Sequence, residues 1–146
     1  MTQYIKQRYD WDCGIAALAM ALNVVYEAAN RMLGMPLTGI HEEHLFQALI
    51  ENGYAYQRKY ENYSLPAMPQ VHGRDNYKKR VPWPCEPFAP AHIVMLQATR
   101  DWHFVVMDKS GHVYDPWNEK RETLADPDYK KVSWVLGIWK VEPWVK

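Results

Sequence analysis

The most constraining feature of this chain is an alanine- and leucine-rich stretch near its N-terminus. Residues 13–23 run Cys-Gly-Ile-Ala-Ala-Leu-Ala-Met-Ala-Leu-Asn, and strong helix formers dominate them. Apolar residues lie on nearly all sides of the helix that this pattern predicts, yet the apolar run is only nine residues long, far below the roughly 20 that cross a bilayer. We therefore expect a buried central helix. Asp10 or Asp12 is expected to supply its N-cap oxygen, which places Cys13 in the first turn.

Two further helices are expected in the first half of the chain. One covers residues 26–33 and stops at Gly34, and the other covers residues 40–51. The Asn-Gly pair that ends at Gly53 is expected to close the latter helix in a left-handed conformation. Its expected core face consists of Leu45, Leu49 and Ile50.

The C-terminal part of the chain has the composition of strands. Its apolar and β-branched segments are residues 92–97, 102–108, 112–115 and 132–141. A tight turn at Lys-Ser-Gly is expected to join the second and third of these segments as a hairpin. Helices followed by an antiparallel sheet define an α+β fold. The sequence shows no internal repeat and no linker, so residues 1–146 are expected to form a single domain.

The segment from Tyr60 to Pro90 differs from both halves. It holds six prolines, a density that prevents a regular helix and favours an irregular loop. Five aromatic residues lie in it, namely Tyr60, Tyr63, Tyr77, Trp83 and Phe88. Loops of this length inside a compact domain are usually functional or disordered. Two interpretations stay open: the loop borders a substrate cleft, or it covers an exposed edge of the sheet.

The charge balance and the cysteine count exclude several classes of protein. Lys+Arg and Asp+Glu both number 17, so the formal net charge is zero, and no long-range attraction to nucleic acid or to an anionic membrane is expected. Two cysteines are too few for a disulfide-stapled scaffold. The N-terminal residues lack the apolar centre of a signal peptide. We therefore expect a cytoplasmic protein that binds neither nucleic acid nor a membrane.

Cys13 is the candidate nucleophile. A thiol at a helix N-terminus meets the positive end of the helix dipole, which favours the reactive thiolate. The carboxylates of Asp10 and Asp12 oppose this effect, because nearby negative charge disfavours a second one. A base with a pKa near neutrality is therefore needed, and histidine is the side chain that supplies it. Taken alone, Cys13 also fits a small buried core residue.

Four short motifs follow one another in order along the chain. Gln7 lies six residues before Cys13, which stands in the triplet Asp-Cys-Gly, and His103 and Asp115 open the sequences His-Phe-Val-Val and Asp-Pro-Trp. His103 and Asp115 fall near the ends of paired strands in the expected hairpin, so their side chains can meet. This pattern resembles the papain-like cysteine peptidases, and most closely the bacteriocin-processing peptidases that cut after double-glycine leaders.

The resemblance implies a fold, a site and a reaction. The fold is α+β and papain-like, with a central N-terminal helix that carries Cys13 and packs on an antiparallel β-sheet. Cys13 is implied to be the nucleophile, His103 the general base, Asp115 the residue that orients the base, and Gln7 a donor of the oxyanion hole. The implied reaction is hydrolysis of a peptide or isopeptide bond in a peptide or protein substrate, through a thioester acyl-enzyme and without a metal or other cofactor.

The sequence leaves other functions open and offers further candidate residues. An amidase or acyltransferase can use the same triad, and an inactive papain-like module can bind a protein through the aromatic loop. Three tryptophans are candidates for substrate binding: Trp11, Trp83 and Trp102. His41 and His44 lack a third ligand and the four-residue spacing of zinc peptidases, so a solvated helix face is expected rather than a metal site. Cys85 is expected to be a loop thiol.

Overall fold

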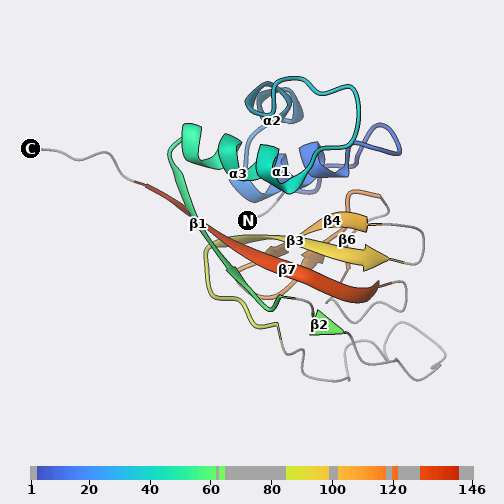
Figure 1. Ribbon diagram of the computed structural model, residues 1–146, viewed down its shortest axis with the longest axis vertical. Coiled ribbons are helices and arrows are strands. Elements are labelled where there is room, and N and C mark those ends of the chain that lie inside the picture. Colours follow the sequence, from blue (N-terminus) through green and yellow to red (C-terminus); the bar gives the residue numbers. More distant parts are fainter. Residues whose placement is uncertain are drawn as a thin grey trace, which may run out of the picture.

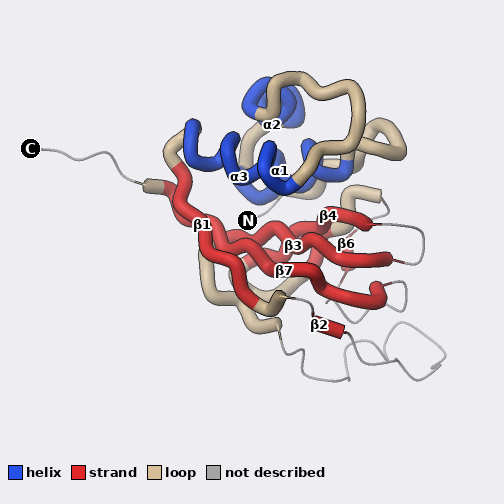
Figure 2. The backbone as a smooth tube through the Cα atoms, viewed as in Figure 1, coloured by secondary structure: helices blue, strands red, loops and turns tan. Residues whose placement is uncertain are grey.

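The protein is an α+β structure in which the helices lie on one side of an antiparallel sheet (Figures 1 and 2). It is represented by a computed structural model, which describes residues 3–61, 63–64, 85–98, 102–117, 120–121 and 129–141. Within these residues there are three helices and seven strands. The predicted fold class is confirmed.

The three helices follow one another in the first third of the chain. Their bounds are α1 Cys13–Leu22, α2 Tyr26–Met32 and α3 Glu42–Glu51. Every residue of α1 from Gly14 to Met20 is buried, as its apolar pattern predicts. Helix α1 packs on the middle strands β3 and β4, while α3 packs on β1. Among the described residues no single helix could cross a bilayer; α1 and α2 would have to act as a pair, and they are bent by 109°.

The strands form one sheet with the order β1-β7-β3-β4-β5-β6, and β2 adds to β7. Their bounds are β1 Tyr54–Lys59, β2 Tyr63–Ser64, β3 Ala91–Ala98, β4 Trp102–Asp108, β5 Val113–Tyr114, β6 Lys120–Arg121 and β7 Tyr129–Lys140. All strand pairs are antiparallel. The expected hairpin is β4–β5. The pairing of β1 with β7 was not expected, because the sequence Tyr-Ala-Tyr-Gln-Arg-Lys lacks a clear apolar alternation.

The sheet is buried on both faces. Alternate residues such as Phe104 and Val106 join the core under the helices, while Val105 and Met107 join a second apolar cluster on the other face. A register shift in the β3–β7 pairing leaves Ser133 opposite no residue of β3. This bulge turns the strand at Ser133 and re-aims the side chains around it.

The described ends of the 60–90 segment cover the face of the sheet that lies away from the helices. Cys85 is buried in the second cluster, and Tyr60 and Phe88 pack against it. Gly137 on β7 makes room for this cover, since a Cβ there would collide with the ring of Phe88. These ends therefore act as a cover for the sheet. Residues 65–84, which include Trp83, lie outside the described residues.

Two details of the helices differ from the expectation. The side chain of Asp12 makes no cap hydrogen bond to α1, although Asp12 is the N-cap residue. Ile50 is 60% exposed, whereas Leu45 and Leu49 are fully buried. The buried face of α3 holds Leu45, Ala48 and Leu49, and Ile50 falls one residue beyond that face.

His92, which lies on β3, binds the C-terminal end of this cover. Its Nε2 accepts hydrogen bonds from the backbone N–H groups of Phe88 and Ala89 at 3.0 and 3.1 Å, and its Nδ1 lies 3.0 Å from the carbonyl oxygen of Met107. These roles require a neutral ring with the proton on Nδ1. Burial lowers the pKa of His92, although the bond to Met107 opposes this shift.

This arrangement predicts acid sensitivity of the fold. The unfolded chain takes up a proton at His92 near pH 6.5, while the folded chain does so only at lower pH. The contribution of His92 to stability should therefore be lost as the pH drops below about 6.5, toward the lowered pKa. Urea unfolding between pH 7.5 and 5.5 measures this slope. In His92→Gln the slope over this window should be smaller; an unchanged slope would contradict the assignment.

Candidate active site

Cys13 is the first residue of α1 and is partly buried. The amide N–H groups of this first turn have no partners within the helix, so the site carries donors and the positive end of the helix dipole. The loop before α3 closes over this turn, because a Cβ on Gly14 would lie 2.7 Å from the side chain of Ile40. Glycine after Cys13 therefore permits this close approach.

His103 and Asp115 meet at the start of β4. His103 Nε2 lies 2.6 Å from Asp115 Oδ1, and only 13% of the histidine side chain and 4% of the aspartate side chain are exposed. Asp115 Oδ1 also accepts the backbone N–H of Trp117 at 2.9 Å, which fixes the carboxylate. Since Nε2 is taken by Asp115, Nδ1 is the ring nitrogen left for another partner.

Cys13 also interacts with this ring. Burial of the His103 ring disfavours its positive charge, but hydrogen bonding and charge interaction with Asp115 and with Cys13 outweigh this effect and raise the pKa of His103 to about 9. The imidazole is therefore held in its charged form at neutral pH. A positive ring between a carboxylate and a thiol stabilises the thiolate, which is the nucleophilic form.

Gln7 lies in the segment that leads to α1 and is buried. Its backbone N–H donates to the carbonyl oxygen of Pro116 at 2.9 Å, directly after Asp115. Its side-chain Nε2 donates to the carbonyl oxygen of Tyr9 at 2.6 Å. Nearby, the hydroxyl of Tyr4 donates to the carbonyl oxygen of Asp115 at 2.7 Å. The N-terminal segment thus bridges the turn after β5 and the start of α1.

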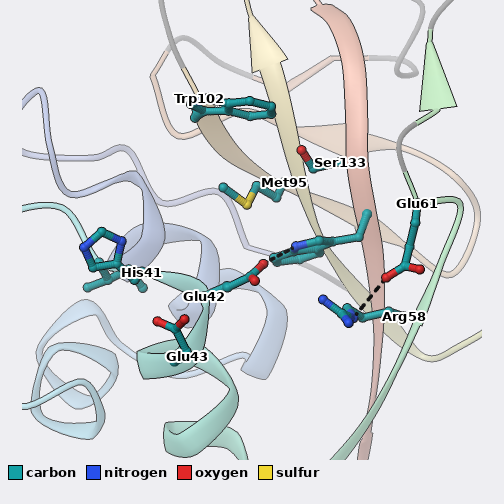
Figure 3. Close-up of a pocket in the computed structure, with 10 residues that line it drawn as sticks. His41, Glu42, Glu43, Arg58, Glu61, Met95, Trp102 and Ser133 are labelled. Carbon is teal, nitrogen blue, oxygen red and sulfur yellow. Dashed lines mark hydrogen bonds and ion pairs between the residues drawn. The ribbon is translucent and has the colours of Figure 1, made fainter.

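A groove of about 490 Å³ lies between α3 and the sheet. Ile40, which contacts the first turn of α1, and Trp102, which precedes His103, both line it. Figure 3 shows His41 and Glu43 on the helix side and Arg58 and Glu61 on the strand side. The remaining lining residues are Glu42, Met95, Ser133 and Trp134. Cys13 and His103 do not line the groove, and its links to them are Ile40 and the residue that precedes His103.

The groove carries an excess of negative charge. Arg58 Nε lies 3.3 Å from Glu61 Oε1, so these two charges compensate one another. The carboxylates of Glu42 and Glu43 remain, and Glu42 accepts the indole N–H of Trp134 at 2.7 Å. This wall of α3 was not expected from the sequence, because only the packing of α3 against β1 turns its first turn toward the sheet.

The other candidate residues of the sequence are spread over the structure. Trp102 is 49% exposed at the groove. Trp11 stacks on Tyr9 with ring centroids 5.3 Å apart and does not line this groove, and Trp83 lies outside the described residues. Cys85 is buried, and burial raises the pKa of its thiol to about 12, so it is unreactive at neutral pH.

His41 and His44 lie side by side at the start of α3. Their rings are 5.9 Å apart, and the backbone N–H of His41 donates to His44 Nδ1 at 3.3 Å. In the part of the chain that the structure describes, no three metal-binding side chains gather. The hydrogen bond uses one ring nitrogen of His44 to fix the start of the helix.

Known structures share this architecture. No family model and no curated protein matches the sequence. A double-glycine motif protease from an AMS/PCAT transporter, crystallised in complex with the leader peptide, matches with a TM-score of 0.62 and 18% identity, over 97% of this chain and 93% of that chain. The chain has the fold of these peptidases. The peptidase domain of Streptococcus ComA, a bifunctional ABC transporter of a quorum-sensing pathway, matches with a TM-score of 0.63 and 12% identity, over 97% of this chain and 100% of that chain.

The resemblance to double-glycine peptidases is therefore confirmed at the level of the fold. One of these structures is a double-glycine motif protease and the other is a peptidase domain, and the match covers nearly the whole length of each. Identities of 12 and 18% establish the fold alone, so the activity of this chain has to be argued from its own site.

The raised pKa of His103 leads to a test with a thiol reagent. At pH 7 the positive ring of His103 interacts with Cys13, and the thiolate is the form of a cysteine that iodoacetamide attacks. Iodoacetamide should therefore label Cys13 roughly 10- to 30-fold faster in the wild type than in His103→Ala. The advantage should shrink above pH 9, where His103 loses its proton. Mass spectrometry after timed quenching measures both rates.

Cys85→Ser serves as the control for this measurement. Since Cys85 is buried, this variant should label at the same rate as the wild type. Equal labelling of wild type and His103→Ala at pH 7 would show that the ring does not activate Cys13.

Proposed function

We propose that this chain is a cysteine peptidase in which Cys13, His103 and Asp115 form the catalytic triad. The observation that carries the proposal is the His103–Asp115 contact of 2.6 Å on a ring that also interacts with Cys13 and has a pKa of about 9. A structural histidine needs no such pair of partners. A thiol, a charged imidazole and a buried carboxylate in this order are what acyl transfer by a cysteine requires.

The first half of the reaction forms a thioester. The Cys13 thiolate attacks the carbonyl carbon of the scissile bond, and the carbonyl electron pair moves onto oxygen to give a tetrahedral oxyanion. When the oxyanion collapses, the C–N bond breaks and the His103 imidazolium gives its proton to the leaving amine. Asp115 keeps the ring oriented throughout and stabilises its positive charge.

The second half releases the acid. A water molecule gives a proton to the now neutral His103 and attacks the thioester carbon. The second tetrahedral oxyanion collapses, and Cys13 leaves as the thiolate beside the reprotonated ring. The backbone N–H of Cys13 and the amide of Gln7 are the donors proposed for both oxyanions.

The groove beside Trp102 is the proposed site for the substrate. A leader peptide is bound to one of the double-glycine peptidase structures, which supports a peptide rather than a small amide as the substrate here. The apolar side chains of Met95 and Trp102 line the same groove as the carboxylate of Glu43, a combination that suits a side chain with an alkyl stem and a positive end. A peptide with Lys or Arg near the scissile bond meets this description.

Removing the proposed site residues one at a time should separate activation of the Cys13 thiol from turnover of the substrate. With a mixed peptide library as substrate, Cys13→Ala should abolish cleavage and His103→Ala should reduce it by at least about 1,000-fold. Gln7→Ala should lower kcat by about 100- to 1,000-fold, as expected for loss of one oxyanion donor, while iodoacetamide still labels Cys13 at the wild-type rate. Product analysis by mass spectrometry measures cleavage. A folded wild type that labels fast at Cys13 yet cuts no peptide would instead favour a binding module.

The groove predicts a substrate preference that can be removed. In the same library, cleavage should be enriched near Lys and Arg, and Glu43→Gln should lower kcat/KM for these peptides by about 3- to 10-fold, the effect of roughly 1 kcal/mol from an exposed charge pair. Peptides without a positive residue should be cut as before. Glu51→Gln, at the other end of α3, is the matched control. Equal losses for charged and uncharged peptides would argue against this role of Glu43.

A further inference from the structure

Asp12 is a fully buried carboxylate that the proposed reaction does not use. Only 1% of the residue is exposed. One of its carboxylate oxygens accepts the backbone N–H of Arg8 at 2.9 Å and the hydroxyl of Tyr26 at 2.6 Å, and the other accepts the backbone N–H of Tyr9 at 2.8 Å. Three donors on one carboxylate form a strong, charge-assisted set of hydrogen bonds.

The same residue also holds the start of α1. The backbone carbonyl oxygen of Asp12 accepts the N–H groups of Ile15 and Ala16 at 3.1 and 3.2 Å. Its main chain therefore belongs to the helix that carries Cys13, while its side chain binds the segment that carries Gln7. Asp12 thus links the helix that carries Cys13 to the segment that carries Gln7.

The connection to Gln7 runs through the backbone of a single residue, Tyr9. The N–H of Tyr9 donates to Asp12 Oδ1 at 2.8 Å, and the carbonyl oxygen of Tyr9 accepts from Gln7 Nε2 at 2.6 Å. An amide nitrogen has two N–H groups, so the bond to Tyr9 fixes the plane of the Gln7 amide and leaves a second donor. The other end of the segment is fixed as well, because the backbone N–H of Gln7 donates to Pro116.

As a carboxylate, Asp12 is an unfavourable neighbour for a thiolate at Cys13, so its presence there needs a structural reason. A carboxylate one residue before Cys13 disfavours a second negative charge nearby. The two backbone donors and the Tyr26 hydroxyl offset part of this charge, and the guanidinium of Arg8 lies 3.8 Å from the centre of the Tyr26 ring. A helix cap does not explain the residue, since its side chain makes no cap bond.

We propose that Asp12 is a positioning residue for the oxyanion hole: its buried carboxylate fixes the backbone of Tyr9, which in turn orients the amide of Gln7 relative to Cys13. This inference rests on the proposed function of Gln7 and Cys13. The two aspartates then have different roles: Asp12 positions an oxyanion donor, whereas Asp115 orients the base. An asparagine in this place could not accept all three hydrogen bonds, because one of its two terminal atoms is an NH₂ donor.

The inference is tested by comparing two reactions of Cys13. Hydrolysis of p-nitrophenyl acetate passes through a tetrahedral oxyanion, whereas alkylation by iodoacetamide does not. Asp12→Asn has nearly the same shape but loses one acceptor and the negative charge. We expect it to lower kcat for the ester about 10- to 100-fold, while iodoacetamide labels Cys13 at an unchanged or higher rate because a neighbouring negative charge has been removed.

A double-mutant cycle shows whether the effect passes through Gln7. If it does, Asp12→Asn should cost less than about 3-fold when Gln7 is already alanine. Tyr26→Phe, which removes one of the three donors, should cost less than 10-fold in the wild-type background. Asp10→Asn, an exposed carboxylate on the same segment, is the matched control and should leave both reactions unchanged.

Each outcome decides between named alternatives. If Asp12→Asn slows ester hydrolysis and alkylation equally, the substitution has damaged the site in general. If Asp12→Asn lowers kcat as much in the Gln7→Ala background as in the wild type, Asp12 does not act through Gln7. Either result overturns the proposal, and so does an unchanged kcat in Asp12→Asn. A wild type that hydrolyses the ester no faster than Cys13→Ala would refute the proposed function itself, and this inference with it.

Discussion

The packing of α1 on the centre of the sheet is the constraint on which the site depends. This helix is apolar on almost every side and buried from Gly14 to Met20, so it is stable only between the other helices and the middle strands. Its contacts with β3 and β4 fix its direction across the sheet. As a result its first residue, Cys13, comes to the end at which β4 begins with Trp102 and His103. The thiol and the imidazole meet because two apolar surfaces have to be covered.

The N-terminal segment completes what this packing leaves open. It touches the turn after β5 through Tyr4 and Gln7 and joins α1 through Asp12. Helix packing alone tolerates small shifts of a helix along a sheet, whereas acyl transfer needs groups placed within a fraction of an ångström. Hydrogen bonds to both sides of the site restrict such shifts. The segment therefore holds the start of α1 and the turn after β5 in a fixed relation to one another.

Two buried carboxylates serve this site in different ways. Asp115 pairs with an imidazole and, together with Cys13, raises the pKa of His103 to about 9. Asp12 meets only neutral donors at its oxygens, namely two amide groups and a hydroxyl. One carboxylate thus sustains a positive charge, and the other holds a backbone conformation. The environment of each determines its role, although both are aspartates.

Much of the architecture followed from local patterns in the sequence. The apolar periodicity of α1 and the β-branched runs of β3 and β4 are properties of short segments, and they predicted these elements close to their observed bounds. The order of Gln7, Cys13, His103 and Asp115 was sufficient to indicate the papain-like fold, which the solved structures confirm.

Other features depended on partners that are distant in the chain. Strand β1 has a weak local pattern and forms because β7 offers it an edge. Asp12 looked like a helix cap, but Tyr26 and the backbone of Arg8 and Tyr9 compete for its oxygens. The sequence by itself thus determined most of the helices and strands and which residues are candidates for the chemistry. Only the tertiary structure decided which of them meet and which acidic groups face the groove, because those contacts depend on surfaces that exist only after the chain has packed.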